Sequence, residues 1–292
     1  MKKEIDFLII GAMKSGTTSL FRYLQGHSQI FMVPGKEVVF FSNNNNFSKG
    51  LDWYINQHFD QKRSFQLWGE ASPQYMCFDY VPKRIYSLFP NVKLIAILRN
   101  PIDRAFSHYR MAKRREKVNS SFEVCIQYLI RRGKTSDEKN IDLEKEFIMF
   151  GEYGRILLNY LNYFSKKNIK IVFTENLRDD PIAVMKEIYN FLNIQEEFKM
   201  DVIGKRFHVG GEKRFMNIRN IIMNNRRYFR RIVPLRIRRS FRFWLETQFI
   251  VKPVEPPALS MNIRNILKDY YRQDVALLEK TFNIKVPWTD FN

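Results

Sequence analysis

The sequence predicts an α/β fold of three layers, in which helices cover both faces of a central, mainly parallel sheet. Short apolar runs have the length and composition of buried parallel strands, at residues 7–10, 93–98 and 170–176. Each run is followed by a segment with helical spacing of its apolar residues, at residues 18–25, 104–115 and 181–192. This alternation of strands and helices favours parallel pairing, because each helix returns the chain to the same edge of the sheet.

Other segments complete the expected architecture. Apolar residues at helical spacing predict two more helices, within residues 143–167, where Gly151 and Gly154 interrupt the pattern, and over residues 263–282. The asparagine run at residues 43–46 predicts a surface loop. No repeat or linker divides the chain, so we expect a single domain over residues 1–292 with a basic helical segment at about 205–245.

The charge of the chain implies an anionic partner. The formal net charge is +19 over 292 residues, and residues 205–242 contain thirteen Lys or Arg against one acid, Glu212. A phosphate-bearing ligand, an acidic glycan, a nucleic acid or a membrane surface would each match this charge. Two cysteines, Cys77 and Cys125, do not indicate a disulfide framework. No apolar run is long enough for a membrane span or a signal peptide, so we expect a cytoplasmic protein.

The stretch "GAMKSGTT" follows the first predicted strand and opens the first helix. Gly11 and Gly16 have the spacing of a phosphate-binding P-loop, but Thr17 stands where a nucleoside-triphosphatase needs lysine, and the lysine lies inside the loop at Lys14. Backbone N–H groups and a helix N-terminus can still hold a phosphate there. The expected phosphate-binding residues are Lys14, Ser15, Gly16, Thr17, Thr18 and Ser19.

A second anion site is predicted after the strand at residues 93–98. Arg99 follows that strand directly, and Pro101 opens the next helix, where proline is tolerated in the first turn. Ser107 lies two turns further along, so a guanidinium and a hydroxyl can grip one anion. The sequence therefore predicts two separate phosphate grips. A surface salt bridge and an ordinary helical serine are the alternative interpretation of this pair.

Together these motifs resemble the sulfotransferase family. "GAMKSGTT" resembles its loop for the 5′-phosphosulfate, and "LIAILRNPIDRAFSHYRM" resembles its 3′-phosphate motif. Further stretches resemble the branch with the heparan-sulfate N- and O-sulfotransferases, namely "KEVVFFS", "GLDWYINQHF" and "GEASPQYM". The resemblance is dense over residues 7–111 and sparser to residue 181. It implies a P-loop-like fold, a bacterial-type soluble member, and 3′-phosphoadenosine 5′-phosphosulfate (PAPS) as donor, with no metal required.

The resemblance also implies roles for single residues. Glu70, in "GEASPQYM", matches the catalytic base, and Lys14 would stabilise the transferred sulfuryl group and the leaving phosphate. Lys36 would lie near the sulfuryl group or the acceptor. "HVGGEKRF" resembles the late basic loop that closes over the cofactor, so Lys213 and Arg214 are expected to bind it, although their spacing departs from that of the heparan branch.

Alternatives to these roles remain open at this point. Glu70 can instead form an ordinary ion pair, and Lys36 can be a solvated loop lysine. Burial beside Trp68 and Tyr75 would raise the pKa of Glu70 into the range useful for a base. Phenol and steroid sulfotransferases use a histidine as base, but His108 lies inside the 3′-phosphate helix and is poorly placed for that role.

The acceptor is not determined by the sequence. A hydroxyl or amine of a glycan, a glycolipid or a small metabolite, anionic or neutral, fits the resemblance. The basic stretch at residues 224–244 can line a substrate cleft, dock on an anionic membrane or be solvated. Two other classes of protein are the alternatives: a P-loop nucleotide kinase, which needs lysine at position 17, and a nucleic-acid-binding protein, which explains the charge but not two ordered phosphate motifs.

Overall fold

A computed structural model describes residues 4–34, 36–59, 66–132, 143–198, 202–204 and 259–292. Its centre is a five-stranded sheet in the order β2-β3-β1-β4-β5, and every neighbouring pair is parallel. The strands are β1 (Phe7–Gly11), β2 (Ile30–Met32), β3 (Leu67–Ala71), β4 (Lys93–Leu98) and β5 (Ile169–Phe173). Because β1 is the middle strand, the loop that follows it lies at the centre of the carboxyl edge of the sheet, between the ends of β3 and β4.

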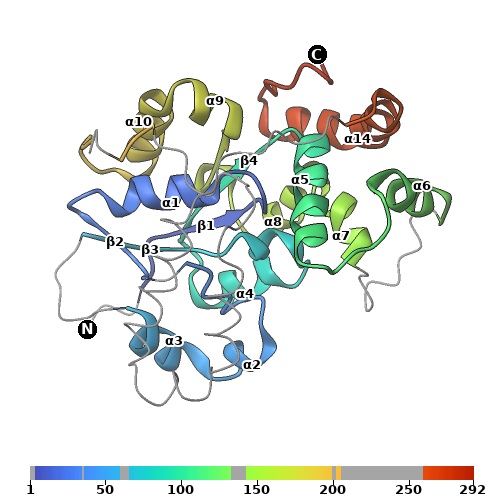
Figure 1. The fold of residues 1–292 in the computed structure, drawn as a ribbon. Helices are drawn as coiled ribbons and strands as arrows, with labels where there is room; N and C mark the ends of the chain where they lie inside the picture. The colour runs from blue at the N-terminus through green and yellow to red at the C-terminus, as the bar shows by residue number, and fades with distance from the viewer. Residues whose placement is uncertain (1–3, 35, 60–65, 133–142, 199–201, 205–258) are drawn as a thin grey trace, which may run out of the picture.

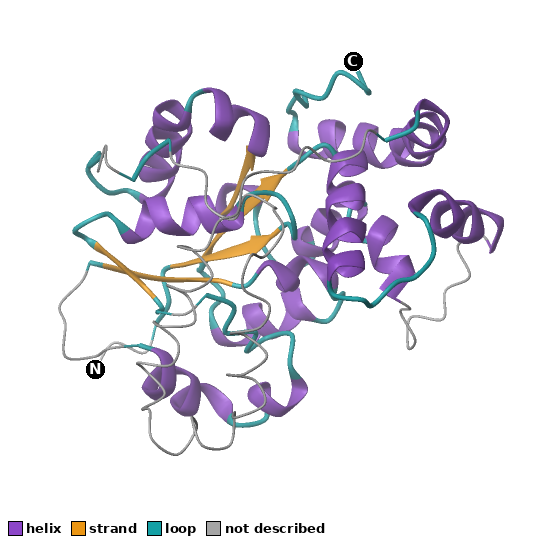
Figure 2. Ribbon diagram, viewed as in Figure 1, coloured by secondary structure: helices purple, strands orange, loops and turns teal. Residues whose placement is uncertain are grey.

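Helices cover both faces of this sheet, as Figures 1 and 2 show. The helices are α1 (Thr17–Gln25), α2 (Asn44–Phe47), α3 (Gly50–His58), η1 (Pro73–Cys77), α4 (Val81–Leu88), α5 (Pro101–Arg114), α6 (Phe122–Arg132), α7 (Leu143–Met149), α8 (Tyr153–Leu161), η2 (Lys166–Asn168), α9 (Thr174–Asp179), α10 (Pro181–Leu192) and α14 (Met261–Phe282). Helices α1, α9 and α10 pack on one face, and α3 to α8 with α14 pack on the other.

The alternation of side chains along β1 explains these two layers. Phe7 and Ile9 point into the cluster beneath α1 and α10, whereas Leu8 and Ile10 point into the larger cluster beneath α5, α8 and α14. All four side chains are fully buried, as expected for a central parallel strand covered on both sides. The predicted three-layer, P-loop-like α/β fold with a parallel central sheet is confirmed.

The predicted elements are found with small shifts of their ends. The three expected strands are β1, β4 and β5, and the helix expected over residues 181–192 is α10. The long helical pattern is interrupted near Gly151, so that α7 ends at Met149 and α8 begins at Tyr153. The loop predicted at residues 43–46 is wrong: Asn43 accepts a hydrogen bond from the Asn46 N–H and caps the short helix α2.

Some expectations fall outside the described residues. The basic segment at about 205–245, with Lys213 and Arg214, belongs to this group. Within the ranges that the structure describes, no helix is long and apolar enough to cross a bilayer. In the same ranges, no three metal-ligating side chains gather into one group.

Candidate active site

The phosphate loop connects β1 to α1 and has an unusual backbone. Lys14 has a φ of 70° and Gly16 a φ of 88°, so both are left-handed, which suits glycine and strains lysine. Gly11 has a different requirement, because a methyl group there would lie 2.3 Å from Met76 Sδ. The Ala12 N–H donates to Ile97 O (2.8 Å), which attaches the loop to the neighbouring strand β4. Gly16 therefore serves the left-handed turn of the loop, whereas Gly11 leaves room for Met76 at the end of β1.

Lys36 reaches into this loop from a separate segment. Its Nζ donates hydrogen bonds to Thr17 Oγ1 (2.7 Å) and Thr18 Oγ1 (2.9 Å). The segment that carries it is attached to the end of β3, since the Glu37 N–H donates to Ala71 O (3.1 Å). Burial lowers the pKa of Lys36 to about 8, although the neighbouring Glu37 acts in the opposite direction. The structure thus brings Lys36 together with two hydroxyls of the predicted phosphate loop.

Lys14 lies in a concentration of positive charge. Its Nζ is 3.7 Å from Met111 Sδ on α5, and Arg99 donates to its carbonyl oxygen (3.4 Å). Burial, together with the charges of Arg114, Arg115 and Arg99, lowers the pKa of Lys14 to about 8. Such crowding of positive charges is unfavourable when no anion is bound to the loop, and it therefore favours the binding of an anion.

The second predicted phosphate-binding site lies where β4 meets α5. Arg99 is half-buried directly after β4, and its carbonyl oxygen accepts a hydrogen bond from Tyr153 OH (3.0 Å). Ser107 is half-buried on α5, and no hydrogen bond joins it to Arg99 among the described residues. Thr174 Oγ1 lies within hydrogen-bond distance of both Ser15 O (2.6 Å) and Leu98 O (2.9 Å), which holds the two phosphate motifs side by side.

Sequence reasoning missed the basic residues further along α5. Burial lowers the pKa of Arg110, and the charges of Arg114 and Arg99 lower it as well. Arg110 lies about one helical turn beyond Ser107, and Arg114 a further turn on, so all three share a face of α5. The signal was available, since a 3.6-residue period through α5 places Arg110 and Arg114 on the face of the helix that carries Ser107.

Glu70 lies inside the sheet layer, one residue before β3 ends. Its side chain is fully buried, and burial raises its pKa to about 8, against the effect of the nearby Tyr75 and Tyr54 hydroxyls. Both of its carboxylate oxygens are shielded from solvent. An ordinary solvent-exposed ion pair is therefore not the environment of Glu70, and the expected rise of its pKa is found.

His108 is buried on the inner face of α5. Its Nε2 lies 3.7 Å from Glu146 Oε2, and its ring packs against Phe147 and Phe150. Burial lowers the pKa of His108 to about 3, and the charges of Arg104 and Lys14 contribute. A histidine with so low a pKa stays neutral and is a weak base near neutral pH.

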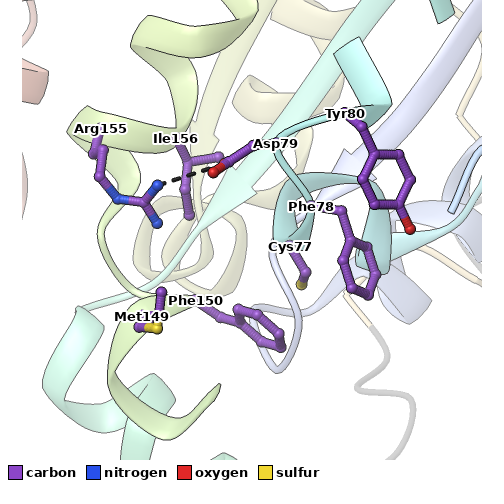
Figure 3. Close-up of a pocket in the computed structure, with 8 residues that line it drawn as sticks. All are labelled: Cys77, Phe78, Asp79, Tyr80, Met149, Phe150, Arg155 and Ile156. Carbon is purple, nitrogen blue, oxygen red and sulfur yellow. Dashed lines mark hydrogen bonds and ion pairs between the residues drawn. The ribbon is translucent and has the colours of Figure 1, made fainter. Parts of the chain in front are cut away.

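A pocket of about 110 Å³ lies between η1 and the junction of α7 and α8 (Figure 3). Its lining residues are Cys77, Phe78, Asp79, Tyr80, Met149, Phe150, Arg155 and Ile156. Arg155 and Asp79 form an ion pair (3.5 Å), drawn as a dashed line in Figure 3. Two residues in or beside this lining are fixed by packing: Met76, which precedes Cys77, packs on Gly11, and Phe150 packs on His108 of α5.

Known proteins resemble this chain in sequence and in fold. It is 32% identical over 199 residues to bifunctional heparan sulfate N-deacetylase/N-sulfotransferase 4 of Mus musculus, covering 66% of this chain and 22% of that protein. It is 33% identical over 205 residues to the bifunctional heparan sulfate N-deacetylase/N-sulfotransferase of Drosophila melanogaster, covering 65% and 20%. The chain thus spans about a fifth of the length of these curated relatives.

A solved structure shares the fold of this chain, and a family model assigns the family. The crystal structure of a sulfotransferase from Alicyclobacillus acidocaldarius superposes with a TM-score of 0.67 at 23% identity, covering 97% of both chains. The model of the sulfotransferase domain matches residues 4–232 of this chain. Because that match extends over well more than half of the sequence, the chain belongs to the sulfotransferase domain family.

Proposed function

We propose that this chain transfers a sulfuryl group from PAPS to a hydroxyl or amine of a glycan, a glycolipid or a small metabolite. The observation that supports this most directly is the meeting of Lys14, Lys36 and Arg99 at one loop, on the carboxyl edge of a parallel sheet. Ligands of open α/β sheets bind at this edge. The cationic donors and the N-terminus of α1 suit a ligand with two phosphate groups.

The donor would lie along this edge. The loop residues from Lys14 to Ser19 would hold its 5′-phosphosulfate, and Arg99 with Ser107 its 3′-phosphate. When bound, PAPS supplies an activated sulfuryl group on a phosphate leaving group. Lys213 and Arg214 would add to the 3′-phosphate side. Lys14 and Lys36 would gather positive charge where negative charge develops on the sulfuryl oxygens and the leaving phosphate.

Glu70 would act as the general base. As the acceptor oxygen or nitrogen forms its bond to sulfur and the bond from sulfur to the 5′-phosphate breaks, Glu70 would take the acceptor proton. Burial raises its pKa to about 8, which makes it a stronger base than an exposed carboxylate. A general base must lie within hydrogen-bond reach of the proton, directly or through one water, so the acceptor must approach β3 beside Tyr75.

Calorimetry with 3′-phosphoadenosine 5′-phosphate (PAP), the desulfonated donor, tests the cofactor site. We expect the wild type to bind PAP without Mg²⁺, and Arg99→Ala to weaken that binding at least tenfold because a charge-assisted contact is lost. Arg272→Ala is the matched control, since this arginine is exposed and pairs with Asp269 on the same helix. Binding that depends on Mg²⁺ would indicate a kinase-type site instead, and a preference for polynucleotides over PAP would indicate a nucleic-acid-binding protein.

Turnover tests the base separately from the cofactor site. With labelled PAPS and a panel of amino sugars, glycans and small metabolites, we expect Glu70→Gln to lose transfer while PAP affinity stays within about twofold of the wild type. Near-normal turnover of Glu70→Gln would contradict the assignment of the base. This panel also identifies the acceptor class.

The pocket beside η1 is our proposed position for the acceptor ring. Phe78 and Tyr80 offer ring faces, while Asp79 can accept and Arg155 can donate hydrogen bonds to ring substituents. Asp79 is exposed and its ion pair with Arg155 is long, so Asp79→Ala should leave stability nearly unchanged. We expect this variant to raise KM for the acceptor and not Kd for PAP. An unchanged acceptor KM would refute this position.

A further inference from the structure

The short turn that presents Arg99 is fixed through its neighbour Asn100. Asn100 is 5% exposed, and each of its polar groups has a partner. Its N–H donates to Glu175 Oε1 (3.1 Å), and its Oδ1 accepts from the Ile102 N–H (3.0 Å). Its Nδ2 donates to Asp290 Oδ2 (2.6 Å), a contact across 190 positions of the sequence. The backbone beside Arg99 therefore depends on a residue from the segment that follows α14.

This segment reaches the turn by a second route as well. Trp288 Nε1 donates to Glu175 Oε2 (3.2 Å), while the other oxygen of Glu175 holds the Asn100 N–H. The Trp288 ring is 1% exposed and lies 6.0 Å from the ring of Tyr153, whose hydroxyl donates to Arg99 O. Trp288 thus supports both groups that hold the peptide unit between Arg99 and Asn100, one at its carbonyl oxygen and one at its N–H.

Asp290 is itself fixed firmly. Arg264 on α14 donates two hydrogen bonds to it, from Nε (2.8 Å) and Nη2 (2.6 Å), and its remaining nitrogen reaches Asp103 in the first turn of α5 (3.0 Å). Burial alone would raise the pKa of Asp290, but the hydrogen bonds from Arg264 and Asn100 hold it below its usual range. Asp290 is therefore an ionised acceptor in a fork-shaped pairing, which is geometrically specific.

The side chain of Arg99 has no comparable support of its own. Among the hydrogen bonds of the described residues, its guanidinium makes one, at 3.4 Å, to Lys14 O. Its direction is therefore set mainly by the backbone from which it projects. A small rotation of that backbone would displace the guanidinium at the end of a long side chain, and misplacing a binding group by about 1 Å is costly.

We propose that Asp290 and Trp288, with Arg264 behind Asp290, are positioning residues for the cofactor site. They hold the turn at Asn100 so that Arg99 points at the phosphate it binds, although none of the three touches the ligand. This inference rests on the proposed role of Arg99 in the function given above. It assigns a functional task to a segment that none of the cofactor motifs includes.

The test is a double-mutant cycle read by PAP calorimetry and steady-state kinetics. We expect Asp290→Ala to weaken PAP binding and raise KM for PAPS roughly tenfold, the scale seen when a supporting partner of a binding group is removed. The acceptor KM and kcat at saturating PAPS should stay near wild type. Asp290→Asn, which keeps one acceptor oxygen, should fall between wild type and Asp290→Ala. Asp269→Ala is the matched control, because this α14 aspartate pairs with an arginine at the exposed surface.

The decisive variant combines Arg99→Ala with Asp290→Ala. If Asp290 acts through Arg99, the second substitution adds little to the loss of PAP affinity that the first causes. Additive losses would overturn the inference, and so would an Asp290→Ala variant that binds PAP normally while Arg99→Ala does not. If Arg99→Ala itself leaves PAP binding unchanged, the proposed role of Arg99 fails, and the inference fails with it.

Discussion

Replacing Glu70 with glutamine should make the stability of the protein less dependent on pH. Burial raises the pKa of Glu70 to about 8 from its ordinary 4.5. Below pH 4.5 the carboxyl is protonated in the folded and the unfolded chain, and its full contribution to stability is present. Between pH 4.5 and 8 the unfolded chain releases this proton and the folded chain keeps it, so wild-type stability falls by about 1.4 kcal/mol per pH unit.

The expected difference is therefore large enough to measure. From pH 5 to pH 8, Glu70→Gln should gain stability relative to wild type by about 3.5 kcal/mol, because glutamine does not titrate. Guanidinium unfolding followed by tryptophan fluorescence gives both free energies, provided that the slope with denaturant is the same for the two proteins. Glu187→Gln, at an exposed ion pair with Lys170, is the matched control. Parallel pH dependences of Glu70→Gln and wild type would refute a buried, proton-holding Glu70.

Other expectations concern the site and its surroundings. The pH profile of kcat/KM should be bell-shaped with its maximum near pH 8, because Glu70 and Lys14 each have a pKa of about 8. The rate should rise as Glu70 loses its proton and fall as Lys14 loses its own. A plateau from pH 6 to 7 would contradict this expectation. Replacing His108, whose pKa is about 3, with glutamine should leave the shape of that profile unchanged, and loss of one limb would make His108 a titrating participant. Gly11→Ala should destabilise the fold by about 1–3 kcal/mol through its clash with Met76, measured by thermal melting, and Met76→Ala should recover part of that loss.

The sequence predicted those strands and helices whose hydrophobic pattern is complete within a short segment. The run at residues 93–98 is β4, and the pattern at residues 181–192 is α10, because an apolar run or a helical period is complete within each segment. The strand expected over residues 170–176 ends earlier, at Phe173, since Thr174 begins α9.

Two strands, β2 and β3, could not be predicted in this way. Strand β2 has three residues, and β3 reads Leu-Trp-Gly-Glu-Ala, with a glycine and an acid inside. Their strand conformation comes from pairing in the sheet: Gly69 pairs with Phe7, and a methyl group at Gly69 would lie 2.2 Å from the Phe7 ring. Tertiary packing therefore decides these segments, against their own propensity.

In the candidate site, too, residues with a local sequence signal could be predicted and residues without one could not. Lys14 and Arg99 were visible because each stands at a fixed offset from a strand end in one motif. The hydrogen bond from Asn100 to Asp290 was not visible, since the two lie far apart in sequence and Asp290 belongs to no pattern. The residues proposed to bind the cofactor lie in local sequence motifs. The residues that fix their backbone can come from any part of the chain that the fold places beside them.

The crowding of Lys14 and Lys36 has a consequence for how the loop receives an anion. Both amines have a pKa of about 8, so near that pH each carries its proton only part of the time. A bound phosphate favours the charged amines and would draw protons from the buffer. The heat of PAP binding at pH 8 should therefore change with the ionisation heat of the buffer. Binding of the anion would then be coupled to proton uptake by Lys14 and Lys36.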